Sequence, residues 1–74
     1  MATIEIHAEV TGSVWKLLKK PGEAVSEGDE LMLIESMKME IPVISEEAGT
    51  VLEVLVAEGE AIQEGQIVLT IAAG

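Results

Sequence analysis

Few side chains in this chain could support catalysis or bind a metal. It has one histidine, His7, and no cysteine among its 74 residues, so disulfides and thiolate metal sites are excluded. His7 has no sequence partner that would suggest a metal site or a catalytic triad, and we expect a solvated strand residue there. Ser36 has no base beside it in the sequence. The sequence therefore predicts a non-catalytic chain.

The most unusual local sequence surrounds Lys38. This lysine lies between Met37 and Met39, and it is one of only four lysines on a chain with no arginine and 14 acidic residues. Two interpretations are open at this point. The methionines could be core residues with Lys38 a solvated strand residue, or the three residues could form an exposed tip that presents the amine.

The composition limits the expected partners and compartment. The formal net charge is -10, and so acidic a surface would repel the phosphates of nucleic acid and of anionic membranes. Neither is an expected partner. The N-terminal residues lack the basic segment and long apolar run of a signal peptide, and no apolar run is long enough to span a bilayer. We therefore expect a cytoplasmic protein whose acidic residues keep a small aliphatic domain soluble.

The chain contains an internal repeat with an offset of 37 residues. Residues 2–37 correspond to residues 39–74, and Lys38 lies between the two copies. Three glycine pairs have equal spacing: Gly12 with Gly49, Gly22 with Gly59, and Gly28 with Gly65. Two copies are too few for a solenoid, so we expect two similar halves packed about a pseudo-twofold axis. That symmetry would place the Lys38 segment at the opposite pole from both chain ends.

Apolar alternation and frequent glycines predict short strands rather than helices. Strict alternation fails in residues 13–19 and 50–56, which indicates a bulge in each. The expected strands cover residues 3–6, 13–19, 24–25, 31–35, 41–44, 50–56, 61–62 and 67–72. We therefore predict one all-β domain over residues 1–74, a flattened antiparallel barrel or sandwich of about eight short strands with pseudo-twofold symmetry.

The boundary between the two halves predicts a hairpin turn at Lys38, although no glycine marks it. Tight hairpin turns need positive φ at both central residues and favour Asn-Gly, so Met37 and Lys38 would be strained there. Strain of this kind persists mainly where function requires it. The pattern therefore favours the exposed-tip interpretation over the core interpretation.

Several groups of residues carry a resemblance to a known family. They are Glu-Ser-Met-Lys-Met-Glu at 35–40, Gly-Ser-Val at 12–14, Gly-Thr-Val at 49–51, and the Gly-Glu-Ala segments at 22–24 and 59–61. The whole chain resembles the biotinyl domain of biotin-dependent carboxylases, the biotin carboxyl carrier or biotin/lipoyl attachment family. The resemblance implies the barrel-sandwich hybrid fold and a biotin joined covalently to Lys38. It also implies that Met37 and Met39 contact the ligase or the biotin ring. Glu35 and Glu40 are either ligase contacts or a solvated face.

The resemblance implies a biotin carboxyl carrier, a swinging-arm domain that carries carboxybiotin between a biotin carboxylase site and a carboxyltransferase site. The implied partners are biotin protein ligase, biotin carboxylase and carboxyltransferase, with fatty acid biosynthesis as an expected setting.

Residues 9–11 replace the Pro-Met-Pro that often precedes Gly12 in the family. Residues 16–22 leave no room for the thumb of some acetyl-CoA carboxylase carriers. The chain is therefore more similar to the thumbless carriers of acyl-CoA carboxylases, pyruvate carboxylase or decarboxylases.

Two alternatives stay open for the function. Lipoyl domains share the fold and the central lysine, but they usually have aspartate or another residue before that lysine and alanine after it. The two methionines therefore favour biotin. The other alternative is an unmodified hairpin module that serves as an assembly adaptor.

Overall fold

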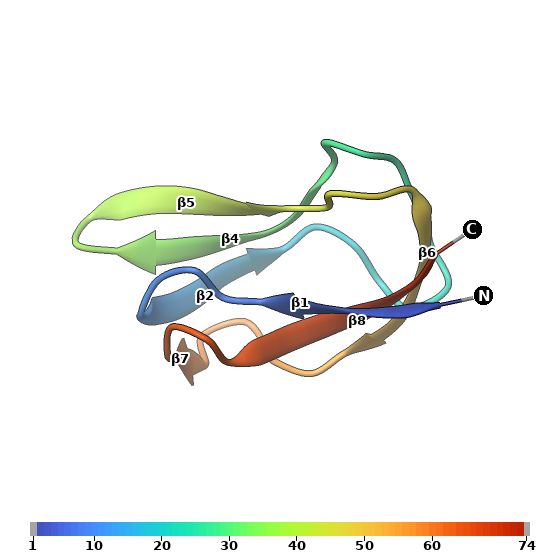
Figure 1. Cartoon of the computed structure of the whole chain (residues 1–74). Coiled ribbons are helices and arrows are strands. Elements are labelled where there is room, and N and C mark those ends of the chain that lie inside the picture. Colours follow the sequence, from blue (N-terminus) through green and yellow to red (C-terminus); the bar gives the residue numbers. More distant parts are fainter. Residues whose placement is uncertain (1, 74) are drawn as a thin grey trace.

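The computed structural model describes residues 2–73, which form eight β-strands in two sheets (Figure 1). The strands are β1 (Thr3–His7), β2 (Gly12–Leu17), β3 (Ala24–Val25), β4 (Glu30–Ser36), β5 (Met39–Ile44), β6 (Gly49–Val54), β7 (Ala61–Ile62) and β8 (Ile67–Ala73). Each sheet has four antiparallel strands, in the orders β1-β8-β6-β3 and β5-β4-β2-β7. The predicted all-β fold is confirmed. Residues 2–73 include no helix long and apolar enough to cross a membrane.

A pseudo-twofold axis relates the two halves of the chain, as the internal repeat predicts. The repeat offset converts the strand order of one sheet into that of the other. It also relates individual hydrogen bonds: Gly22 N donates to Val51 O at 2.8 Å, and Gly59 N donates to Val14 O at 2.7 Å. Each sheet contains two strands from each half. Neither half can therefore complete a sheet without the other.

The core lies between the two sheets, and within residues 2–73 it contains no aromatic side chain. In β1, half-buried residues alternate with exposed ones, as expected for a strand with one face against the core. The buried hydrophobic residues are Ala8, Val14, Val25, Leu31, Met32, Ile34, Val43, Val51, Val56, Ile62, Val68, Leu69 and Ile71. Burial of these side chains is the main favourable contribution to folding in so small a domain.

The strands β2 and β6 each contain the predicted bulge. The register of β2 against β4 shifts around Trp15, and the register of β6 against β8 shifts around Leu52. The strands end at Leu17 and Val54, two residues earlier than predicted. In each connection that follows, a glutamate carboxylate accepts a hydrogen bond from a backbone N–H. Such bonds direct the chain into a turn instead of extending the ladder.

The molecule is elongated, with extents of 36 × 18 × 17 Å. The β4–β5 hairpin forms one end, and the two ends of the described chain lie together at the other end (Figure 1). There Ala73 N donates a hydrogen bond to Ala2 O at 2.8 Å. The predicted placement of the Lys38 segment opposite the chain ends is confirmed.

Candidate functional site

Lys38 lies in the two-residue turn that joins β4 to β5. The ladder between these strands continues to the pair Ser36 and Met39, which leaves Met37 and Lys38 in the turn. The φ angle is 51° at Met37 and 66° at Lys38, and within residues 2–73 no other residue except glycine has a positive φ. Positive φ at both central residues is typical of a type I′ hairpin turn. The predicted strained turn at Lys38 is confirmed.

The surrounding sheet holds this turn in a conformation that neither of its residues favours. A residue with a side chain loses about 1 kcal/mol or more in the left-handed region. Six residue pairs join β4 to β5, and β2 pairs with the other edge of β4. Ile34 of β4 is fully buried beneath this ladder. Relaxation that extends past the last two ladder pairs would therefore also move strand pairs that are packed on the core.

The side chains of the turn are exposed to solvent. The exposed fraction is 91% for Met37 and 62% for Met39, and Lys38 is also exposed. The interpretation of the two methionines as core residues is therefore wrong. Large apolar side chains held this far from the core are typical of a contact surface.

Among the residues that the structure describes, no ion pair holds the Lys38 amine. Glu35 and Glu40 lie directly opposite each other in the ladder behind the turn, and both are exposed. Within the part of the chain that the structure describes, the one ion pair joins Lys19 Nζ to Asp29 Oδ2 at 3.9 Å. The amine of Lys38 is therefore not held by a salt bridge there. A contact of Glu35 or Glu40 with a ligase stays a prediction.

The structure adds two polar side chains to the site that the sequence analysis missed. The Ser36 hydroxyl, considered there only as a nucleophile, donates a hydrogen bond to the backbone oxygen of Thr11 at 2.9 Å. The Thr11 hydroxyl accepts a hydrogen bond from Glu64 N at 3.1 Å. The internal repeat contains a signal for these residues, since its second copy has alanine at both equivalent positions, Ala73 and Ala48.

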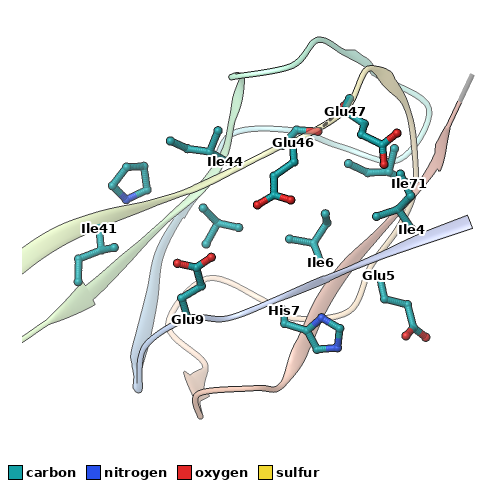
Figure 2. A pocket seen from close by; sticks show the side chains of 13 residues that line it. Ile4, Glu5, Ile6, His7, Glu9, Ile41, Ile44, Glu46, Glu47 and Ile71 are labelled. Atoms are coloured by element: carbon teal, nitrogen blue, oxygen red, sulfur yellow. Dashed lines mark hydrogen bonds between the residues drawn. The ribbon is translucent and has the colours of Figure 1, made fainter.

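A cleft of about 430 Å³ lies between β1 and β5, the edge strands of the two sheets (Figure 2). Ile6 lines the apolar part, and Glu9 and Glu46 approach the gap from opposite sides. His7 also lines the cleft and is exposed on β1, which confirms the predicted solvated strand residue. In residues 2–73 no three His, Cys, Asp or Glu side chains are placed to hold a metal ion. The strained and exposed hairpin tip is the candidate site.

A comparison with known families agrees with this geometry. The sequence model of a family described as "Biotin-requiring enzyme" matches residues 2–71. The chain belongs to this biotin/lipoyl family. The resemblance predicted from the motif at residues 35–40 and the internal repeat is thereby confirmed. A biotin/lipoyl domain is a carrier rather than a catalytic unit, in agreement with the exposed tip.

Two curated relatives match part of this biotin/lipoyl domain. The "Biotinylated protein TB7.3 homolog" of Mycolicibacterium smegmatis is 49% identical over 41 residues, which are 55% of this chain and 58% of that protein. The "Biotin/lipoyl attachment protein" of Bacillus subtilis is 37% identical over 41 residues, 55% of this chain and 56% of that protein. The match thus spans little more than half the length of each relative.

The same fold occurs within a solved carboxylase. The crystal structure of the Kluyveromyces lactis urea carboxylase matches 97% of this chain with a TM-score of 0.92 and 30% sequence identity. The match covers 6% of the urea carboxylase chain. A biotin/lipoyl domain of this shape is therefore a small part of a much longer carboxylase.

Proposed function

We propose that this domain is a biotin carrier and that biotin is attached to Lys38. One observation carries the proposal: the strained two-residue turn holds the Lys38 amine at the exposed tip of the hairpin. A relative named as a biotinylated protein, and the urea carboxylase that contains this fold, support biotin as the attached group. Family membership supports the same choice.

Attachment joins the Lys38 amine to the carboxyl group of biotin through an amide bond. A biotin protein ligase would convert biotin and ATP into an acyl-adenylate and pyrophosphate, and the amine would then displace AMP. A lysine ammonium must lose its proton before it can act as a nucleophile. We assign the base that removes this proton to the ligase. The amide bond removes one positive charge from the domain.

The elongated shape of the domain supports the carrier role. A tether joined at Ala2 or Ala73 leaves the Lys38 tip at the far end of the 36 Å axis. Lys38 would hold the biotin, which would supply the group that carries a carboxyl between a biotin carboxylase site and a carboxyltransferase site of a biotin-dependent carboxylase. The tether raises the effective concentration of the biotin group at each site. A carboxylase of fatty acid biosynthesis stays a predicted setting for this carrier.

Met37 and Met39 are proposed to contact the ligase or the biotin ring, and Met37→Asn tests this role. Asparagine tolerates positive φ better than methionine, so the free energy of unfolding should rise by about 1 kcal/mol in urea denaturation. The same variant should accept biotin several-fold more slowly, because its exposed thioether contact is lost. Met39→Ala, on strand β5, is the matched control and should slow labelling without the gain in stability. Labelling of both variants at the wild-type rate would reject the contact.

Intact-mass analysis of the wild-type chain distinguishes biotin from the alternatives. After incubation with biotin, ATP and a biotin ligase, we expect the mass of one biotinyl group to be added. The name of the Bacillus subtilis relative keeps a lipoyl carrier as the second candidate, so a parallel reaction contains lipoate and a lipoate ligase. Addition of lipoate alone would replace our proposal with the lipoyl carrier. The unmodified mass in both reactions would support the adaptor module and contradict both carriers.

A further inference from the structure

Two side-chain hydrogen bonds at the Lys38 pole depart from the pseudo-twofold symmetry. Ser36 Oγ donates to Thr11 O at 2.9 Å, and Thr11 Oγ1 accepts from Glu64 N at 3.1 Å. We call this linked set of Ser36, Thr11 and Glu64 the tip brace. Its equivalents at the other pole include Ala73 and Ala48, which have no hydroxyl. The shared fold therefore does not require the tip brace, because the second half forms the same strands without it.

The tip brace connects the Lys38 hairpin to two other segments of the same pole. Ser36 is the last residue of β4 and directly precedes the turn. Thr11 lies in the connection between β1 and β2, and Glu64 lies in the turn between β7 and β8. The two bonds span 25 and 53 residues of sequence. They therefore connect the base of the turn to distant parts of the chain.

The turn needs such support because its own residues oppose its conformation. Met37 and Lys38 both have positive φ, and β5 is an edge strand with a ladder partner on one side only. Glu35 and Glu40 add a pair of like charges directly behind the turn. Strain and like-charge repulsion both favour opening of the last ladder pairs. The bond from Ser36 opposes this opening at the residue where it would begin.

We propose that Ser36 and Thr11 are positioning residues that hold the Lys38 turn in the conformation that a biotin ligase binds. The inference rests on the proposed function, since it names what keeps the attachment residue in place. If only a fraction of molecules has the competent turn, the apparent affinity for the ligase falls by that fraction. Loss of the tip brace therefore raises KM for the carrier domain, while kcat stays unchanged once the complex forms.

Kinetics of biotinylation with the Ser36→Ala variant test the inference. We expect KM for the carrier domain to rise by up to about fivefold, the factor that corresponds to one hydrogen bond, with kcat unchanged. Ser36→Thr retains the hydroxyl and should restore the wild-type KM. Thr11→Val, which removes the second bond of the tip brace, should raise KM by a smaller factor. Ser45→Ala is the control. Ser45 Oγ donates a hydrogen bond to Glu47 O at 2.6 Å, and Ser45 follows the end of β5 that is remote from the tip.

NMR of the same variants before modification provides a second readout that loss of stability alone would not change. Positive φ gives a strong NOE between the amide and α protons of one residue, and we expect it at Met37 and Lys38 in the wild type. Ser36→Ala should weaken both NOEs and add exchange broadening at the tip, far below the unfolding temperature. Ser45→Ala should leave both residues unchanged.

The two readouts separate failure of the inference from failure of the proposed function. A wild-type KM in Ser36→Ala, or an equal rise in Ser45→Ala, overturns the tip brace as a positioning device. If the ligase does not modify the wild-type chain, the proposed function fails, and the NMR arm alone then decides. In that case unchanged NOEs at Met37 and Lys38 in Ser36→Ala overturn the tip brace, and weakened NOEs support only its role in holding the turn.

Discussion

Lys38→Arg is expected to abolish biotin attachment without changing the fold. A guanidinium stays protonated at any pH at which the protein is folded, so it cannot attack an acyl-adenylate. The substitution keeps the charge and the approximate length of the side chain at an exposed position. Labelling in the presence of ligase, biotin and ATP should fall below about 1% of the wild-type level by intact-mass analysis.

The other three lysines provide matched controls for this prediction. Lys16 Nζ lies 5.5 Å from the centre of the Trp15 ring, Lys19 Nζ pairs with Asp29, and Lys20 is exposed. None of them lies in a positive-φ turn. Lys16→Arg, Lys19→Arg and Lys20→Arg should each be labelled to the wild-type level. Biotin found on the Lys38→Arg variant would show that another lysine is the attachment residue, and peptide mapping would identify it.

Gly12→Ala is expected to destabilise the domain by about 3 kcal/mol, although it adds only a methyl group. A Cβ at this position would overlap the backbone oxygen of Glu35, and it would lie 3.1 Å from Cγ2 of Ile34. The clashing atoms belong to the backbone of β4 and cannot rotate away as a side chain could. The strands β2 and β4, which pair beside the Lys38 hairpin, would therefore have to separate. Gly49→Ala should cost a similar amount, because its Cβ would overlap the backbone oxygen of Ala72.

Substitution of two other glycines tests the cause of this loss of stability, which is either the close approach of a neighbouring strand or the backbone conformation of the glycine itself. Gly22 and Gly59 have φ angles of 90° and 88°, but a Cβ at either position would meet nothing within 4 Å. Alanine there should cost only the conformational penalty, about 1 kcal/mol. Urea denaturation followed by far-UV circular dichroism measures the difference between the two kinds of variant. Equal losses for Gly12→Ala and Gly22→Ala would contradict the close-approach explanation.

The candidate site was predictable from the sequence because its defining residues are local. Met37, Lys38 and Met39 are consecutive, and the offset between the two copies of the repeat places a boundary at Lys38. Residue propensities alone argue against a tight turn there, since neither central residue is glycine or asparagine. The repeat thus located a turn that local preferences do not favour, and the observed φ angles confirm both the turn and its strain.

Strand pairing was less accessible to the sequence analysis. Alternation with a period of two residues shows which face of a strand is buried, but it does not show which strand lies beside it. The repeat predicted two similar halves, whereas the structure shows that each sheet takes two strands from each half. β1, for example, pairs with β8 at the opposite end of the chain.

By itself, the sequence determined the strand pattern, the twofold repeat and the position of the Lys38 turn, because each depends only on the order and spacing of residues along the chain. Only the tertiary structure decided the contacts between distant segments: Gly12 against Glu35, Ser36 with Thr11, and Thr11 with Glu64. A close approach or a hydrogen bond depends on angstrom-scale distances and on side-chain direction. Those quantities are set when the two sheets pack together, and no residue pattern along the chain specifies them.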